Sequence, residues 1–216
     1  MSPIILNVIL HATLQTLEMV FASTAISVLV GLPLAVFMIV TGPNGLYRLP
    51  IIGRLVGIIV DALRAVPFII LLVVLIPVTR FIAGTSLGTE AAIVPLSIAG
   101  IPYFARLAEV SLREVDMGLI DAVKAMGGTR LTIIRSVLIP EALPSLIGSL
   151  TVTLITMVSA SAMAGAIGAG GLGDLAIRYG YQRFNTTVMM DVVIVLIIMV
   201  FIIQMVGNSL TRWLRH

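Results

Sequence analysis

Three long stretches of the chain contain no charged side chain: residues 19–47, 142–173 and 192–211. A helix of about 20 mostly apolar residues is long enough to cross a lipid bilayer. Only 11% of the residues are charged and 59% are apolar, whereas a soluble domain has about 25% charged and about 45–50% apolar residues. The stretches lack the strict alternation of barrel strands. We therefore exclude a soluble enzyme and predict an all-α, polytopic membrane protein.

Two further spans are expected around shorter charge-free runs. Each reaches spanning length if it extends past an acid–base pair, Asp61 with Arg64 or Arg106 with Glu109. Partners three residues apart share one helical face and can neutralise each other. We therefore expect a single transmembrane domain over residues 1–216 with five transmembrane helices, at about 19–40, 57–79, 90–110, 142–167 and 192–211.

The basic residues predict the direction of these spans. With the N-terminus outside, at least eight Lys and Arg residues fall in inner loops and three in outer loops, an asymmetry that favours an N-out, C-in orientation. The net charge of +3 is explained by this asymmetry, so no nucleic-acid partner is expected. The inner set is Arg48, Arg54, Arg113, Lys124, Arg130, Arg135, Arg212 and Arg215, and the outer set is Arg80, Arg178 and Arg183.

The chain lacks the residues that would power transport or catalysis. It has no cysteine and only two histidines, His11 and His216, so no metal site is expected. Its single lysine, Lys124, is followed by Ala125, whereas a Walker A loop needs Ser or Thr there. We therefore expect no catalytic residue and no cofactor in this chain. The source of energy for transport is therefore expected to be another protein.

The longest polar segment between spans is 111–140. Asp116 is expected to cap a short helix over 117–126, which Gly127 and Gly128 would end. Thr129 can cap a second helix, which Pro140 would end, and the same proline can start the next span, where its missing N–H costs little. On its pattern alone, this segment could also be an amphipathic loop that lies on the bilayer.

This segment resembles the cytoplasmic stretch of importer-type ABC permeases, in which Glu-Ala-Ala precedes a glycine and then Ile-x-Leu-Pro. Here Asp121-Ala122-Val123 precedes Gly127 and then Val137-Leu138-Ile139-Pro140. In that family the stretch is the coupling helix, which sits in a cleft of the ATPase subunit. The resemblance implies that role for Asp121, Ala122, Val123, Lys124, Ala125, Met126, Gly127 and Thr129.

Residues 63–72 resemble a stretch of amino-acid-importing permeases. Other stretches resemble the methionine-uptake permeases of this binding-protein-dependent family, among them 76–80, 91–96, 168–173 and 185–189. The resemblance implies a permease subunit in the inner (cytoplasmic) membrane of a bacterium, which translocates methionine (the L form, with the D form left open) by alternating access. It also implies a homodimer, two ATP-binding-cassette ATPase subunits, which bind ATP and Mg, and an extracytoplasmic methionine-binding protein or lipoprotein. The alternatives are a permease for another amino acid or small amine, a self-contained secondary carrier, and a channel or structural subunit.

The resemblance further implies one pathway on the two-fold axis of the dimer. The span at 142–167 is the expected lining, because its hydroxyls offer hydrogen bonds without a permanent charge; Met163 is a candidate plug. Ordinary helix packing and static proline kinks are the alternative interpretation. The pathway candidates are Thr156, Ser159, Ala160, Ser161, Met163, Pro67 and Pro95.

The segment 168–186 is expected on the outer side. Gly168, Gly170 and Gly173 match a dinucleotide-binding spacing, but a membrane span precedes them instead of a strand, so we interpret them as a sharp turn. The resemblance suggests that the outer face meets the binding protein; an interfacial aromatic belt is the alternative. The contact candidates are Arg178, Tyr179, Tyr181 and Arg183.

Overall fold

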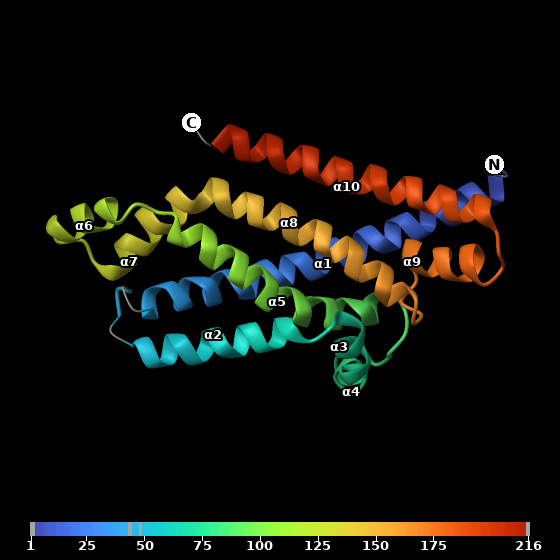
Figure 1. Ribbon diagram of the computed structural model, residues 1–216, viewed down its shortest axis with the longest axis horizontal. Coiled ribbons are helices and arrows are strands. Elements are labelled where there is room, and N and C mark those ends of the chain that lie inside the picture. Colours follow the sequence, from blue (N-terminus) through green and yellow to red (C-terminus); the bar gives the residue numbers. More distant parts are fainter. Residues whose placement is uncertain (1–2, 43–44, 48, 215–216) are drawn as a thin grey trace.

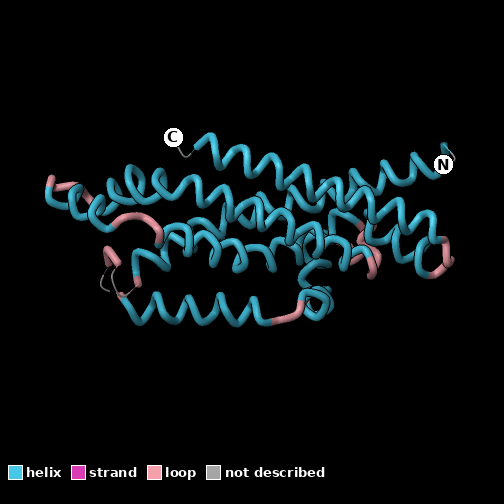
Figure 2. The backbone as a smooth tube through the Cα atoms, turned by 45° about the horizontal axis from the view of Figure 1, so that its top comes forward, coloured by secondary structure: helices cyan, strands magenta, loops and turns pink. Residues whose placement is uncertain are grey.

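The computed structural model describes residues 3–42, 45–47 and 49–214, and within these ranges it is helical with no strand (Figures 1 and 2). Three residues used in the sequence analysis, Arg48, Arg215 and His216, lie outside the described residues. The helices of the first half are α1 (Pro3–Thr41), α2 (Pro50–Ala65), α3 (Phe68–Val74), α4 (Ile76–Ala83) and α5 (Thr89–Arg113). The second half contains α6 (Met117–Ala125), α7 (Arg130–Ile133), the π-helical turn η1 (Ile134–Leu138), α8 (Ile139–Gly165), α9 (Gly171–Leu175), the π-helical turn η2 (Ala176–Tyr181) and α10 (Thr186–Leu214).

Four helical segments are long and apolar enough to cross a membrane: α1, α5, α10 and the continuous path through α7, η1 and α8. The pair α2 and α3 meets the same criteria together, but its two helices are bent by 98°. The structure therefore confirms the all-α membrane fold, with four long spans and a fifth if the bent pair is counted as one.

The expected continuous helix over 57–79 is wrong. The helix breaks at Pro67 and turns again at Leu75 before α4 begins. The break arises because a proline disfavours the helical conformation of the residue before it, and Val66 is indeed extended (ψ 123°). Pro67 therefore lies at a bend and not inside a helix, whereas Pro95 does lie inside α5.

The expected helix end at Pro140 is also wrong, whereas the expected start of the next span there is confirmed, since α8 begins at Ile139 with the proline in its first turn. The helical path continues from Arg130 to Gly165. The π-helical turn over Ile134–Leu138 lies directly before this proline. A π-helical turn widens the backbone locally, and this accommodates a residue that has no N–H to donate. The polar segment and the following span are therefore one connected element.

Helix α5 lies in the middle of the bundle, with α1 packed along its back and α2 and α8 on either side (Figure 1). The approach of α1 depends on small residues, since a Cβ on Gly31 would lie 3.0 Å from the carbonyl oxygen of Ile101. Two of the buried hydroxyls on α1 are satisfied within the helix: Ser23 Oγ donates to Met19 O (2.6 Å) and Ser27 Oγ to Ser23 O (2.7 Å). The helices can therefore pack closely without leaving these groups unpaired.

The glycine-rich segment after α8 turns the chain back onto α1. Gly168, Gly170 and Gly171 all have positive φ, which confirms the sharp turn. The backbone N–H of Gly171 donates to Gln15 Oε1 (3.0 Å), and that of Leu172 donates to Thr16 Oγ1 (2.9 Å). Side chains of α1 thus cap the start of α9. Helix α1 is longer than the predicted span 19–40 because its first turns pack here.

Close packing at this turn makes Gly173 sensitive to substitution. A Cβ there would lie 2.7 Å from the carbonyl carbon of Ala162, which is backbone and cannot rotate away. We expect Gly173→Ala to destabilise the protein by about 1–3 kcal/mol, the usual cost of overpacking. The check is the midpoint of thermal unfolding of the purified complex in detergent. Gly148→Ala is the matched control, since nothing lies within 4 Å of its Cβ position; equal midpoints for the two variants would contradict the packing argument.

Candidate functional site

Helix α6 protrudes at one end of the bundle, which we call the α6 end (Figure 1). Its start is capped as expected, because Asp116 Oδ1 accepts from the N–H of Gly118 (2.7 Å). Its end is closed by Gly127 (φ 80°), whose N–H donates to Lys124 O (3.0 Å). The N–H of Gly128 donates to Val123 O (2.9 Å). The predicted cap and the predicted glycine stop are both confirmed.

The candidate coupling residues are on the surface of the chain. Ile120 is the buried contact of α6 and Val123 is half-buried, whereas Met126 is 79% exposed. Lys124 Nζ lies 2.9 Å from Asp121 Oδ1, so the two side chains form an ion pair on the surface of α6. A short, capped helix with an exposed apolar end is suited to contact a partner. The other exposed candidates are Asp121, Ala122, Lys124, Ala125, Gly127 and Thr129.

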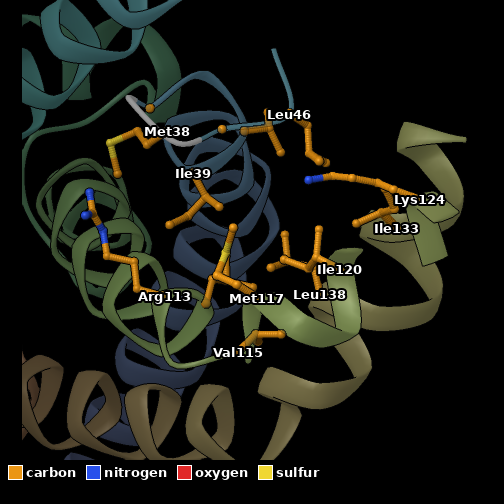
Figure 3. Close-up of a pocket in the computed structure, with 14 residues that line it drawn as sticks. Met38, Ile39, Leu46, Arg113, Val115, Met117, Ile120, Lys124, Ile133 and Leu138 are labelled. Atoms are coloured by element: carbon orange, nitrogen blue, oxygen red, sulfur yellow. The ribbon is translucent and has the colours of Figure 1, made fainter. Parts of the chain in front are cut away.

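A mostly apolar cavity of about 350 Å³ lies between α6 and the ends of α1 and α5 (Figure 3). Met38, Leu112 and Ile120 are among the apolar side chains of its wall, and Arg113 and Lys124 are its charged members. Because of this space, α6 is not packed tightly against α1. A displacement of α6 can therefore occur without compressing a close-packed core.

The candidate pathway residues do not all lie together. Thr156, Ser159 and Met163 recur at helical spacing on the side of α8 that faces away from the core of this chain, which we call its outward side. Met163 is 46% exposed there and Ser159 is exposed. By contrast, Ala160 and Ser161 are buried in the core of this chain, at 7% and 1% exposure.

The two candidate prolines are also separated. Pro95 is fully buried in α5, and Pro67 is exposed at the bend between α2 and α3. In this conformation, the outward members of the predicted set on α8 are therefore Thr156, Ser159 and Met163. The sequence pattern could not separate these from their neighbours, because small and hydroxyl residues occur all around α8.

A network of five charges joins α2 to α5. Glu109, with a side chain only 4% exposed, lies 2.6 Å from Arg106 and 2.5 Å from Arg113. Asp61, 50% exposed, lies 3.4 Å from Arg64 and 3.6 Å from Arg106. The two acid–base pairs expected from their spacing are confirmed. Sequence reasoning did not predict that the two pairs join into one network, because the contact between Asp61 and Arg106 depends on how α2 packs against α5.

The network continues to α8 through an aromatic residue. Thr156 Oγ1 donates to the hydroxyl of Tyr103 on α5 (3.1 Å). The guanidinium of Arg64 lies 5.9 Å from the centre of the Tyr103 ring. Side chains of α2 and α5 are thus linked to Thr156 on α8, and we group them with the exposed residues on the same side of α8 as the polar face. Its residues are Asp61, Arg64, Tyr103, Arg106, Thr156, Ser159 and Met163.

The four outer candidates lie together on η2 and the turn after it. Arg178 Nε donates to Asp174 Oδ1 (2.7 Å), and this hydrogen bond and the carboxylate charge raise the pKa of Arg178. Arg183 stacks over the Tyr179 ring at 4.5 Å, and Tyr181 is 68% exposed. Phe184, which sequence reasoning missed, is 86% exposed and has a positive φ of 53°. Three aromatic rings and two arginines therefore stand at the end of the bundle opposite α6.

Comparison with known proteins gives consistent results over nearly the whole chain. Residues 27–216 match the family model described as "Binding-protein-dependent transport system inner membrane component". The probable D-methionine transport system permease protein MetI of Vibrio cholerae is 50% identical over 210 residues, which cover 97% of this chain and 93% of that protein. Its counterpart in Haemophilus influenzae is 44% identical over 210 residues, covering 97% and 99%. A chain of the MetNI methionine ABC transporter, solved in inward facing conformations, superposes with a TM-score of 0.98 at 45% identity and covers all of both chains.

The buried carboxylate of Glu109 should be worth more to stability than the exposed carboxylate of Asp121. Glu109→Gln removes a charge that two guanidiniums share, and we expect a loss of about 1–3 kcal/mol, as for hydrogen bonds to charged groups. Asp121→Asn breaks a pair whose side chains are 66% and 46% exposed, and exposed pairs contribute at most about 1 kcal/mol. Thermal unfolding midpoints of the two variants test this order. A larger loss for Asp121→Asn would contradict it.

Proposed function

The chain belongs to the family of binding-protein-dependent transport system inner membrane components, and we propose that it is the membrane-spanning permease subunit of an ATP-driven methionine importer. The observation that carries this proposal is the full-length likeness to a chain of the MetNI methionine ABC transporter. The family resemblance of α6 and its exposed position give independent support. The chain itself performs no covalent chemistry, and a separate ATPase subunit binds ATP and Mg and hydrolyses ATP.

The working unit in this proposal is a homodimer of this chain with two ATPase subunits, in the cytoplasmic membrane of a bacterium. A methionine-binding protein or lipoprotein delivers the substrate from outside. The basic residues support an N-out, C-in orientation, which puts the α6 end in the cytoplasm. Residues 1–216 act as one transmembrane domain.

Coupling in this proposal begins with a push on α6. Residues 114–116 connect α6 directly to α5, and residues 126–129 connect it to α7 and thus to α8. Near the α6 end, α5 and α8 are joined by hydrogen bonds of 2.8 Å from Ser145 Oγ to Glu114 Oε2 and between the hydroxyls of Ser111 and Ser149. A displacement of α6 therefore reaches both α5 and α8, which together bear most of the polar face. The cavity beside α6 leaves room for this movement.

Passage of the substrate takes place between the polar faces of the two copies. Thr156 and Ser159 offer hydroxyls to the path, and Met163, 46% exposed, is the gate that separates when the dimer opens. A flexible, apolar methionine can close a path without a permanent charge. At the opposite end, Arg178, Tyr179, Tyr181 and Arg183 contact the binding protein, since Tyr and Arg are frequent anchors of interfaces.

Transport in a reconstituted system tests the proposed function. Proteoliposomes that contain this chain, the ATPase subunit and the binding protein should take up labelled L-methionine only with ATP, because ATP hydrolysis by the partner subunit drives transport in this proposal. Excess unlabelled L-methionine should block this uptake, and D-methionine and other amino acids are the further competitors. ATP hydrolysis without methionine uptake would overturn the substrate and favour another amino acid or small amine. Uptake without the ATPase would overturn the class and favour a secondary carrier.

Substitution of Gly127 tests the coupling role of α6. Nothing lies within 4 Å of its Cβ position within this chain, so a new side chain would point toward the partner. We expect Gly127→Asp to lower ATP-driven uptake about tenfold or more, because one unpaired charge is desolvated at a close contact. ATP hydrolysis and assembly should persist.

The matched control for this test is Gly127→Asn. Asn has nearly the same size as Asp and, like Asp, tolerates the left-handed conformation that position 127 requires. Normal uptake by Gly127→Asp, or an equal loss with Gly127→Asn, would contradict a charge-sensitive contact at this position.

A further inference from the structure

The charged part of the polar face suggests a substrate contact that the family resemblance does not supply. We propose that Asp61, Arg64 and Arg106 form a weak binding site for the head group of a zwitterionic α-amino acid. The two guanidiniums take the α-carboxylate and Asp61 takes the α-ammonium group. This inference rests on the proposed function, because it assumes that the polar face borders the path of the substrate.

The depth of these charges along their helices distinguishes them from charges in loops. Asp61 follows the start of α2 by eleven residues, or about 16 Å of helix, and Arg106 precedes the end of α5 by seven residues, or about 10 Å. The hydrocarbon core of a bilayer is about 30 Å thick. Helix α5 is long and apolar enough to span the membrane, and α2 meets the same criteria together with α3, to which it is joined at a bend. These charges therefore lie at membrane depth and not in a loop.

These charges do not face lipid. Helix α2 has one exposed apolar side, where Ile51, Leu55 and Ile58 are 74%, 55% and 56% exposed. Asp61 and Arg64 fall on a different side by helical spacing, toward α5. Exposed charges at membrane depth are expensive unless they face water or a partner. The apolar side of α2 therefore meets lipid, and the charged side borders an aqueous path.

The positive and negative charges of the network are unequal. Glu109 is held by two guanidiniums at 2.6 and 2.5 Å, so its charge is compensated. The contacts of Asp61, at 3.4 and 3.6 Å, are longer than an ordinary charged hydrogen bond. Three arginines against two carboxylates leave one positive charge. The part of the network that is exposed thus has an excess cation beside a loosely held carboxylate, which complements a carboxylate beside an ammonium.

The position of the site along the path is also informative. Thr156 is at the level of Tyr103, whose ring underlies Arg64. Met163 lies seven residues farther along α8, about 10 Å toward the opposite end. A substrate that reaches the charged site from outside has therefore passed the proposed gate at Met163. The site holds the head group on the α6 side of that gate while the gate closes.

Protection from an arginine reagent tests for carboxylate binding. The complex with its ATPase, without nucleotide or binding protein, is placed in vesicles of neutral lipid and treated with phenylglyoxal. Mass spectrometry then measures modification of each arginine. L-Methionine and N-acetyl-L-methionine should slow the modification of Arg64 several-fold, since both have the carboxylate. Methioninol, which lacks the carboxylate, should not. Arg178, 62% exposed at the other end, is the control that should not respond.

Transport by variants provides the second measurement. Arg64→Gln should lower ATP-driven methionine uptake at saturating binding protein about tenfold, the effect of one charge-assisted hydrogen bond. ATP hydrolysis should remain, and Arg64→Lys should recover part of the uptake because it keeps the charge. Arg54→Gln is the matched control on the same helix, outside the network. Arg106 is unsuitable for this test, because it also holds the buried Glu109.

The two measurements separate failure of the site from failure of the proposed function. Unchanged modification of Arg64 with methionine, together with normal uptake by Arg64→Gln, would overturn the site and leave the importer intact. Protection that requires phosphatidylglycerol in the vesicles and not methionine would assign the cluster to a lipid head group, and would also overturn it. Absence of ATP-dependent methionine uptake by the unaltered complex would contradict the proposed function instead. That result is independent of the labelling, which needs no transport.

Discussion

Inside a bilayer no water is available to solvate polar groups, and this constraint organises the whole structure. Ser23 and Ser27 on α1 donate to carbonyl groups of their own helix. The first N–H groups of α9, those of Gly171 and Leu172, donate to the side chains of Gln15 and Thr16 on α1. Among the described residues, only Thr24 Oγ1 and Asp191 Oδ2 are buried side-chain oxygens without a hydrogen-bond partner, so nearly every buried polar side chain has a partner supplied by the protein.

The same constraint explains why α5 is the centre of the molecule. Glu109 can be buried on it only because Arg106 and Arg113 lie one turn before and one turn after it on the same helical face. Asp61 on α2 then has a guanidinium on α5 to approach. Helix α5 also leads directly into α6, through residues 114–116. In the proposed importer, the helix that organises the charges is therefore also the first to receive a push from the ATPase.

Local chemistry was sufficient to predict several elements. The cap at Asp116 and the stop at Gly127 depend on bonds within a few residues, so the pattern of α6 was visible in the sequence. The ion pairs of Asp61 with Arg64 and of Arg106 with Glu109 could be predicted for the same reason, because the partners are three residues apart on one helix. Pro67 was predicted to kink a span, and the structure shows a larger effect, a bend of 98° between α2 and α3. The rule that a residue before proline avoids the helical conformation already argued against a continuous span over 57–79.

The sequence by itself determined that this chain is a helical membrane protein with a short capped helix outside the spans, because hydrophobic length and capping are local properties. Only the tertiary structure decided which side of α8 is outward, and so separated Ser159 and Met163 from the buried Ala160 and Ser161. It also decided that two separate ion pairs become one network beside Tyr103. Such contacts join residues that are far apart in the sequence, such as Asp61 with Arg106 and Arg64 with Tyr103. They depend on how α2, α5 and α8 pack together, and helical periodicity within any one of them contains no information about its neighbours.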